Sequence, residues 1–462
     1  MLMTSESWKP HNADLYQAIQ QFVEAAIGLL SSAEKTPRLS FEYHQRCEFK
    51  KIGPDQRIVT RHEPRFLLLN DTRDLISNLN ETKRCSEIIR SDPEIELEPF
   101  YEGPNKIEWH LLPFFVSDLI GNDLEFNRIH ANFDVTFKKL ETFLYCRAYR
   151  YRLVAVLDAF TSSVPSVRLS PAITIRRIDD EDCLAMVQSV VGKDEFYPGY
   201  LQEHPYAVII DTEKPKVPDG GNQRLEDENT TVQNIISALR LLRVSRVHIN
   251  VVFNLLITWQ PGCANAFSRK QGIFDFLPSF HLDKDDVPQL HALWKEIEEG
   301  SPQVTRLRIA LDRYDSTFET KDAAEQLIDA VIAFESIYIQ GGSELSHKLA
   351  LRAATVLGKD GKSREQIYAF LKMAYKMRSA LVHGSMSGDD FENWLGAKDS
   401  HGAEFINPLR EDLRKSLRKF LVFFTQHPEL ASASAGNREK LDRFLTSCVL
   451  GNARFEEEQA EQ

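Results

Sequence analysis

Long apolar segments are missing from this chain of 462 residues. No run of 18 or more apolar residues occurs, and the opening MLMTSESWKPHNAD lacks the basic start and apolar stretch of a secretion signal. We therefore expect neither a membrane span nor export. The six cysteines are scattered and none forms a CxxC pair, which argues against a zinc or redox site and fits the reducing cytoplasm.

Common catalytic signatures are missing as well. The chain has no Gly-rich phosphate loop, no GxSxG elbow, no HExxH pair and no EF-hand pattern. Their absence argues against the commoner nucleotide-binding, serine-hydrolase, metalloprotease and calcium-binding proteins. No cluster of metal-ligand residue types stands out either, so we expect no metal and no cofactor.

The chain also lacks an excess of positive charge. Lys and Arg number 56 against 68 Asp and Glu, which gives a formal net charge of −12. No global positive field attracts nucleic acid from a distance, so a site for a polyanion has to be a local patch.

The composition is that of a globular protein, with 42% hydrophobic and 27% charged residues. The length favours two or three compact units. An amphipathic helix is predicted over 12–30, and residues 40–260 mix strands and helices, which predicts an α+β region. The strands are predicted at 142–157, 172–178, 206–211 and 247–259, and the helices at 71–90 and 230–243.

Two breaks divide the chain. The stretch from Thr212 to Thr231 is rich in Pro, Gly and charge, which predicts a surface loop, and Gly300-Ser301-Pro302 forms a second break. We interpret residues 1–300 as an α+β regulatory or sensor region, with two subdomains if the loop at 212–231 separates them.

Residues 303–450 have almost pure helical periodicity and predict a helical bundle. Residues 451–462 are predicted to form an acidic tail. The apolar stripes are Leu307, Leu311, Tyr314, Phe318 and Leu327, Val331, Phe334, Tyr338. Further helices are predicted from Ser343 to Gly358, from a capping box of Ser363 and Gln366 to Gly384, from Asn407 and Pro408 onward, and over 436–450.

One pair of residues suggests chemistry: Arg378 and His383, at the end of the helix that stops at Gly384. A helix C-terminus stabilises a protonated imidazole, as a proton donor needs. The Arg-x4-His interval also occurs at 57–62 and 243–248, in strand-like or loop sequence, so context favours the third match. At 100° per residue the two side chains lie about 140° apart, so convergence requires a frayed last turn or a second chain.

The surrounding segment, 343–384, is basic. It holds eight Lys or Arg against three Asp or Glu, a net charge of +5 in an acidic chain. Either these side chains cover solvated helix faces, or they bind a polyanion. Tyr375 either stacks on a base or packs in the core. The candidate substrate-binding residues are Lys348, Arg352, Lys372, Tyr375 and Lys376.

Glu335 falls on the apolar stripe of Ile328, Ile332 and Ile339, where a carboxylate should be paired. It either orients Arg378 across the bundle or neutralises Arg352. The polar stretch 385–406, with Asp389, Asp390, Trp394 and His401, leaves directly from Gly384, so we expect it near the mouth of the site.

Residues 307–450 resemble the ApeA-like branch of the HEPN superfamily. The likeness rests on LIDAVIAFESIYI (327–339), SELSHKLALRAATVLG (343–358) and above all LKMAYKMRSALVHG (371–384). It covers about a third of the chain. It implies a helical bundle whose Arg-x4-6-His motif forms a metal-independent ribonuclease site at a dimer interface.

Residue by residue, Arg378 and His383 match this motif, Ser379 matches the polar position that follows the Arg, and Glu335 matches an acidic position on an earlier helix. Many members have Asn in place of this Ser. In their general pattern of predicted strands and helices, residues 1–300 resemble the variable regions that precede HEPN domains in phage-defence proteins.

The expected function is therefore a cytoplasmic, metal-independent endoribonuclease of bacterial anti-phage defence. Its expected partners are an RNA substrate, a second copy of the chain bound through the helical domain, and a phage-derived protein or nucleic acid as trigger. The alternative is a non-catalytic helical module for dimerisation or RNA binding, which predicts the same fold.

Overall fold

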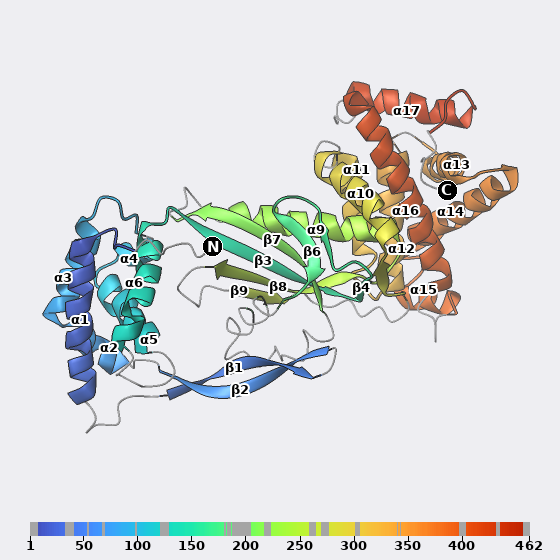
Figure 1. Ribbon diagram of the computed structural model, residues 1–462. Helices are drawn as coiled ribbons and strands as arrows, with labels where there is room; N and C mark the ends of the chain where they lie inside the picture. The colour runs from blue at the N-terminus through green and yellow to red at the C-terminus, as the bar shows by residue number, and fades with distance from the viewer. Residues whose placement is uncertain are drawn as a thin grey trace, which may run out of the picture.

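The chain forms three successive regions in the computed structural model: N-terminal helices, an antiparallel sheet and C-terminal helices (Figure 1). The residues before 300 thus combine helices and strands, and the described residues after it form helices, as the sequence predicted. The structure describes residues 8–32, 41–52, 55–66, 70–97, 99–120, 129–179, 182, 186, 205–216, 223–257, 265–268, 277–300, 305–339, 341, 343–396, 403–430 and 435–455.

The N-terminal helices enclose a core of their own. The predicted stripe of the first helix is confirmed, because Leu15, Ile19, Phe22, Ala26 and Leu30 are all buried. The helices are α1 (Ala13–Ser32), α2 (Asn70–Ser77), α3 (Asn80–Ser91), α4 (Pro99–Glu102), the π-helical turn η2 (Ile107–Leu111), α5 (Leu112–Ile120) and α6 (Ile129–Tyr145).

A long antiparallel hairpin separates α1 from α2. Its strands β1 (Phe41–Ile52) and β2 (Asp55–Phe66) pair in unbroken register from Ile52 and Asp55 to Phe41 and Phe66.

The central sheet has six strands in the order β5-β6-β7-β3-β8-β9, and every neighbouring pair is antiparallel. Alternate residues of β3, namely Leu153, Ala155 and Leu157, belong to the same core cluster as helix α9 (Gln223–Leu242). The strands are β3 (Ala148–Asp158), β5 (Ser166–Arg168), β6 (Ile173–Arg177), β7 (Tyr206–Pro215), β8 (His248–Ile257) and β9 (Asn265–Ser268).

Two short strands connect this sheet region to the helices that follow. Strand β4 (Phe160–Ser162) pairs in parallel with β10 (Phe280–Leu282), and the 3-10 turn η4 (Lys284–Asp286) leads into α10 (Val287–Gly300). Arg243, just after α9, donates to the backbone of His281 at 2.9 Å and to the carboxylate of Asp286, which fixes the start of α10 against α9.

The C-terminal region is a bundle. Both predicted apolar stripes are buried, on α11 and α12. The helices are α11 (Thr305–Ser316), α12 (Ala323–Tyr338), α13 (Leu345–Leu357), α14 (Gly361–Val382), α15 (Gly388–Trp394), α16 (Ala403–Gln426), the 3-10 turn η6 (Pro428–Leu430) and α17 (Ala435–Val449).

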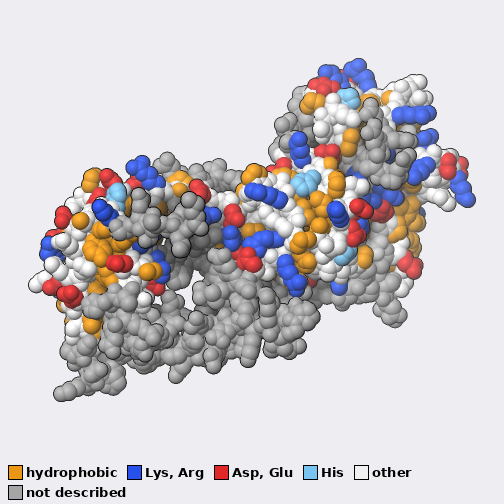
Figure 2. Space-filling model, viewed as in Figure 1, with side chains coloured by type: hydrophobic (Ala, Val, Ile, Leu, Met, Phe, Trp, Pro, Cys, Tyr) orange, Lys and Arg blue, Asp and Glu red, His pale blue; other side chains and the backbone are white. Residues whose placement is uncertain are grey.

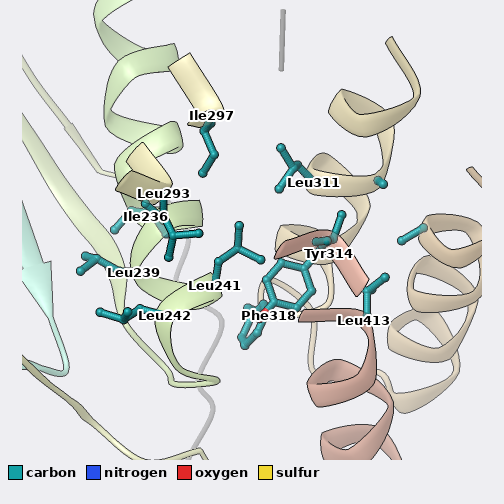
Figure 3. Close-up of a cluster of buried hydrophobic side chains, with 14 of the residues drawn as sticks. Ile236, Leu239, Leu241, Leu242, Leu293, Ile297, Leu311, Tyr314, Phe318 and Leu413 are labelled. Carbon is teal, nitrogen blue, oxygen red and sulfur yellow. The ribbon is translucent and has the colours of Figure 1, made fainter. Parts of the chain in front are cut away.

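One hydrophobic core runs from the sheet into the bundle without a break at residue 300. Figure 3 shows Leu241 of α9 beside Tyr314 of α11 and Phe318, with Leu311 of α11 and Leu413 of α16 on the same side of α9. Each such fully buried side chain contributes about 1.5 to 3 kcal/mol. The sequence break at 300–302 therefore falls between two helices, α10 and α11, and the core of the sheet continues into the bundle.

Polar bonds reinforce this contact between α9 and the bundle. The Arg240 guanidinium, 2% exposed, lies 2.9 Å from the carboxylate of Asp315 on α11. The Tyr314 hydroxyl donates to the backbone oxygen of Arg240 at 2.9 Å, and Arg414 of α16 donates to that of Leu241 at 2.9 Å. The last turns of α9 are thus held by both bundle helices.

Several predicted boundaries are wrong. The loop predicted at 212–231 is shorter, because β7 continues to Pro215 and α9 begins at Gln223. The strand predicted from residue 142 begins at Ala148, since α6 extends to Tyr145. The fifth bundle helix begins at Ala403 and contains Pro408 inside it.

The predicted acidic tail also starts too early. Phe455 packs on Phe420 and Phe423, with ring centroids 5.1 Å and 5.2 Å apart, so residues up to 455 belong to the bundle. The rest of the predicted tail lies outside the described residues. None of the described helices has both the length and the apolar character needed to cross a bilayer.

Candidate functional site

Helix α14 carries most of the candidate residues, and both of its ends are fixed. At its start the Asp360 carboxylate accepts from the backbone N–H of Ser363 at 2.7 Å, and the Ser363 side chain closes a reciprocal bond to Asp360. These bonds lower the pKa of Asp360. The capping box is therefore Asp360 and Ser363, three residues before the predicted one.

The C-terminal end of α14 confirms the predicted stop. Gly384 has φ of +71°, the left-handed conformation that favours glycine. The backbone N–H of Ser385 donates to Ala380 at 2.9 Å, and that of Gly384 donates to Leu381 at 3.2 Å. This is the Schellman pattern, which ends the helix sharply at His383 and leaves no frayed turn.

Glu335 on α12 pairs with Arg378 on α14. Arg378 Nη2 lies 3.6 Å from Glu335 Oε2, and both side chains are about one-fifth exposed (21% and 23%). Burial and the nearby Glu335 carboxylate raise the pKa of Tyr375 on α14. Of the two partners expected for Glu335, the structure selects Arg378.

Arg378 retains a free donor. Its Nε is buried and has no hydrogen-bond partner among the described residues. A guanidinium held by one carboxylate through Nη2 still presents further N–H groups to an anion.

His383 is exposed at the end of α14. Because the helix is regular up to this residue, the 100° turn per residue keeps His383 about 140° from Arg378 around the helix axis. Arg378 faces α12, whereas His383 faces solvent on the same side as Lys372 and Lys376. Within one chain, the side chains of Arg378 and His383 therefore point in different directions.

A shallow cavity of about 660 Å³ lies between the first turn of α13 and the middle of α14. We name it the α13–α14 cavity. Its lining residues are Glu344, Leu345, Ser346, His347, Lys372 and Tyr375.

A polar cluster adjoins this cavity. The hydroxyl of Tyr368 lies 3.0 Å from His347 Nδ1 and 3.4 Å from Lys372 Nζ. The sequence did not predict His347 or Tyr368 as site residues, because they lie on different helices and no spacing rule connects them.

Arg352 is a correction to the predicted substrate-binding set. Its side chain is 6% exposed, and it donates to the backbone oxygen of Tyr338 at 2.8 Å, to Asp442 at 2.8 Å and to Thr446 at 3.2 Å. The guanidinium therefore ties α13 to α12 and α17 and is not free to reach a substrate.

The other predicted residues lie at or near the surface. Lys376 is exposed one turn after Lys372, and Lys348 is half-buried next to His347 on α13. Ser379 is half-buried, and its backbone oxygen accepts from the N–H of His383 at 3.0 Å. Figure 2 shows several Lys and Arg side chains at the end of the molecule that carries α13, α14 and α17.

The stretch after Gly384 was predicted only as a polar segment, but it contains a helix. Helix α15 carries Asp389, Asp390 and Trp394, and it packs against α12 and α14, the two helices that bear Glu335 and Arg378. Phe391 anchors it and is fully buried. His401 lies outside the described residues.

The two other Arg-x4-His matches have ordinary structural places. Arg57 and His62 lie on strand β2 of the N-terminal hairpin. Arg243 is bound to Asp286, and His248 on β8 lies 3.3 Å from Asp158.

Among the described residues, no group of three or more His, Cys, Asp or Glu side chains is placed to hold a metal ion. Comparison of the chain with protein-family models, with curated proteins and with solved structures finds no match.

Proposed function

We propose that the chain is a metal-independent endoribonuclease of the HEPN type, active as a twofold dimer that brings His383 and Arg378 of two chains together. The observation that carries the proposal is the divergence of these residues on a helix that is regular to its last turn. A twofold axis beside the end of α14 would set the exposed His383 of one chain near Arg378 of the other.

The residue types suit cleavage of RNA through the ribose 2′-OH. The reaction needs a base for this hydroxyl, an acid for the departing 5′ oxygen and a cation for the charge that develops on phosphate. The His383 imidazole of one chain can act as the acid or the base, because the ring carries one nitrogen that accepts a proton and one that donates it. Arg378, whose side chain is 21% exposed, can stabilise the phosphate charge through its guanidinium.

Glu335 has a positioning role in this proposal. Its ion pair with Arg378 holds the guanidinium against α12 while leaving donors for phosphate. The Ser379 side chain next to Arg378 is proposed as a minor polar contact to substrate.

The wider role that we propose is anti-phage defence in the bacterial cytoplasm, with residues 1–300 sensing a phage-derived protein or nucleic acid. Support comes from the continuous core and the buried Arg240–Asp315 pair, through which a change near α9 would reach α11.

The test is cleavage of total RNA by the purified full chain with EDTA present. His383→Ala and Arg378→Ala should each slow cleavage by about 10² to 10⁴-fold, since each removes a group that acts in the transition state. DNA should be spared because it lacks the 2′-OH, and the RNA products should end in cyclic phosphate or its hydrolysed form.

Matched controls are His281→Ala and Arg443→Ala, which remove an exposed His and an exposed Arg elsewhere. Loss of activity in EDTA, or full activity of both motif variants, would contradict the proposal.

The second candidate function is a non-catalytic dimerisation or RNA-binding module. The observation in its favour is that two apolar side chains of α14 are exposed, Met373 at 37% and Val382 at 50%. This candidate predicts that the chain sediments as a dimer and does not cleave RNA.

A further inference from the structure

The α13–α14 cavity has the chemistry of an anion site with an aromatic wall. Lys372 has no carboxylate partner among the described residues, and its ammonium lies 5.5 Å from the ring centre of Tyr368. Glu344 is the carboxylate in the lining. Tyr375 is the aromatic residue in the lining, and it lies near Glu335.

The hydrogen bonds around Tyr368 determine the donors that remain. The ammonium of Lys372 can only donate, so the Tyr368 hydroxyl accepts from it at 3.4 Å. The Tyr368 hydroxyl also lies 3.0 Å from His347 Nδ1, and His347 donates through Nε2–H in the tautomer in which Nδ1 accepts from this hydroxyl. Lys372, with three N–H groups, and this tautomer of His347 offer the donors that a bound phosphate needs.

The cavity is aligned with His383 on α14. At 100° per residue, Lys372, Tyr375, Ser379 and His383 all fall within an arc of about 80° on one face of the helix. Lys372 and His383 are eleven positions apart, which corresponds to about 16 Å along the helix at 1.5 Å per residue. That length corresponds to a few nucleotides of an extended single strand.

We propose that the α13–α14 cavity is a subsite for one nucleotide of single-stranded RNA that lies outside the cleaved bond. Lys372 and His347 bind its phosphate, and its base stacks on Tyr375. Lys376, on the same exposed side of α14, contacts the strand between this subsite and His383. This inference rests on the ribonuclease function proposed above and names where its substrate extends.

Binding is the direct test, with cleavage prevented by His383→Ala. In this background, the dissociation constant of a fluorescent single-stranded RNA of about twelve nucleotides is measured by anisotropy over a range of salt concentrations. Adding Lys372→Ala should weaken binding about tenfold and reduce the slope of log affinity against log salt by about one, since one phosphate contact is lost.

Two further variants separate the contacts. Tyr375→Ala should also weaken binding by about tenfold, whereas Tyr375→Phe should bind like the parent because it retains the ring. Lys440→Ala, an exposed lysine on α17, is the matched control and should leave both affinity and salt slope unchanged. Each variant should unfold at the same temperature as the parent, which would show that its fold is intact.

The outcomes distinguish this subsite from the ribonuclease function. Unchanged affinity and salt slope in Lys372→Ala would overturn the subsite, whether or not the parent chain cleaves RNA. Weakened binding in Lys372→Ala and Tyr375→Ala would support the subsite even if the parent chain cleaves nothing, in which case the ribonuclease proposal alone fails.

Discussion

Replacing Asp315 by Ala tests the contact that joins the sheet region to the bundle. The Asp315 carboxylate accepts from Arg240 at 2.9 Å, from Gln233 at 3.3 Å and from the hydroxyl of Ser237. The side chains of Arg240 and Asp315 are 2% and 6% exposed. Truncation therefore leaves a guanidinium in the core without its counter-charge.

The magnitude follows from this burial. Removing one partner of a buried ion pair costs about 3 to 5 kcal/mol of unfolding free energy. For a domain of about 150 to 250 residues each kcal/mol lowers the melting temperature by roughly 2 to 4 °C. We therefore expect Asp315→Ala to melt at least about 6 °C below the parent in calorimetry, and urea unfolding to give the same ranking.

Two variants control the interpretation. Glu439→Ala removes an equally short pair, 2.8 Å from Arg443, whose side chains are 68% and 72% exposed. It should cost less than about 0.5 kcal/mol. The double variant Arg240→Met with Asp315→Leu should recover most of the stability, because no buried charge is left uncompensated. A loss below about 1 kcal/mol in Asp315→Ala would refute the reasoning.

Two other substitutions probe buried charges in the bundle. Burial raises the pKa of Asp412 on α16 to about 6, so the native state holds a proton that the unfolded state releases, and stability falls as pH rises through this value. Asp412→Asn should therefore exceed the parent in unfolding free energy at about pH 8 by about 1 to 3 kcal/mol and lose this gain on acidification to about pH 4, near the pKa of the unfolded carboxyl; equal urea curves for both proteins at both pH values would contradict this. Arg352→Ala should cost about 2 to 3 kcal/mol, since it removes charged hydrogen bonds to Tyr338 and Asp442. Its affinity for RNA should stay at the parent value, and weakened RNA binding by a folded Arg352→Ala would count against the structural role.

Local periodicity predicted the helices well. The stripes at 307–318 and 327–338 are buried as expected, and Gly384 ends α14, because side-chain spacing and the left-handed preference of glycine act within a few residues. Helix starts were predicted less well. Ser363 with Gln366 and Asp360 with Ser363 are competing caps three residues apart, and only the folded chain selects the second.

Contacts between helices were not predictable from the sequence. Both Arg352 and Arg378 are basic residues within reach of an acidic partner, and sequence spacing does not decide between them. Packing does: α13 turns Arg352 toward Asp442 on α17, and α14 turns Arg378 toward Glu335. For the same reason the sequence suggested a boundary near residue 300, whereas α9 and α11 share one core.

Mixing two inactive variants tests the central claim most directly. His383→Ala and Arg378→Ala chains are unfolded, refolded together at equal concentration and assayed for RNA cleavage in EDTA. If the site uses His383 of one chain and Arg378 of the other, half of the dimers are mixed and each retains one complete pair, so activity should recover to about a quarter of the parent rate. If both residues act within one chain, or do not act at all, the mixture will cleave no faster than the two variants measured separately, and the account of a shared site is wrong.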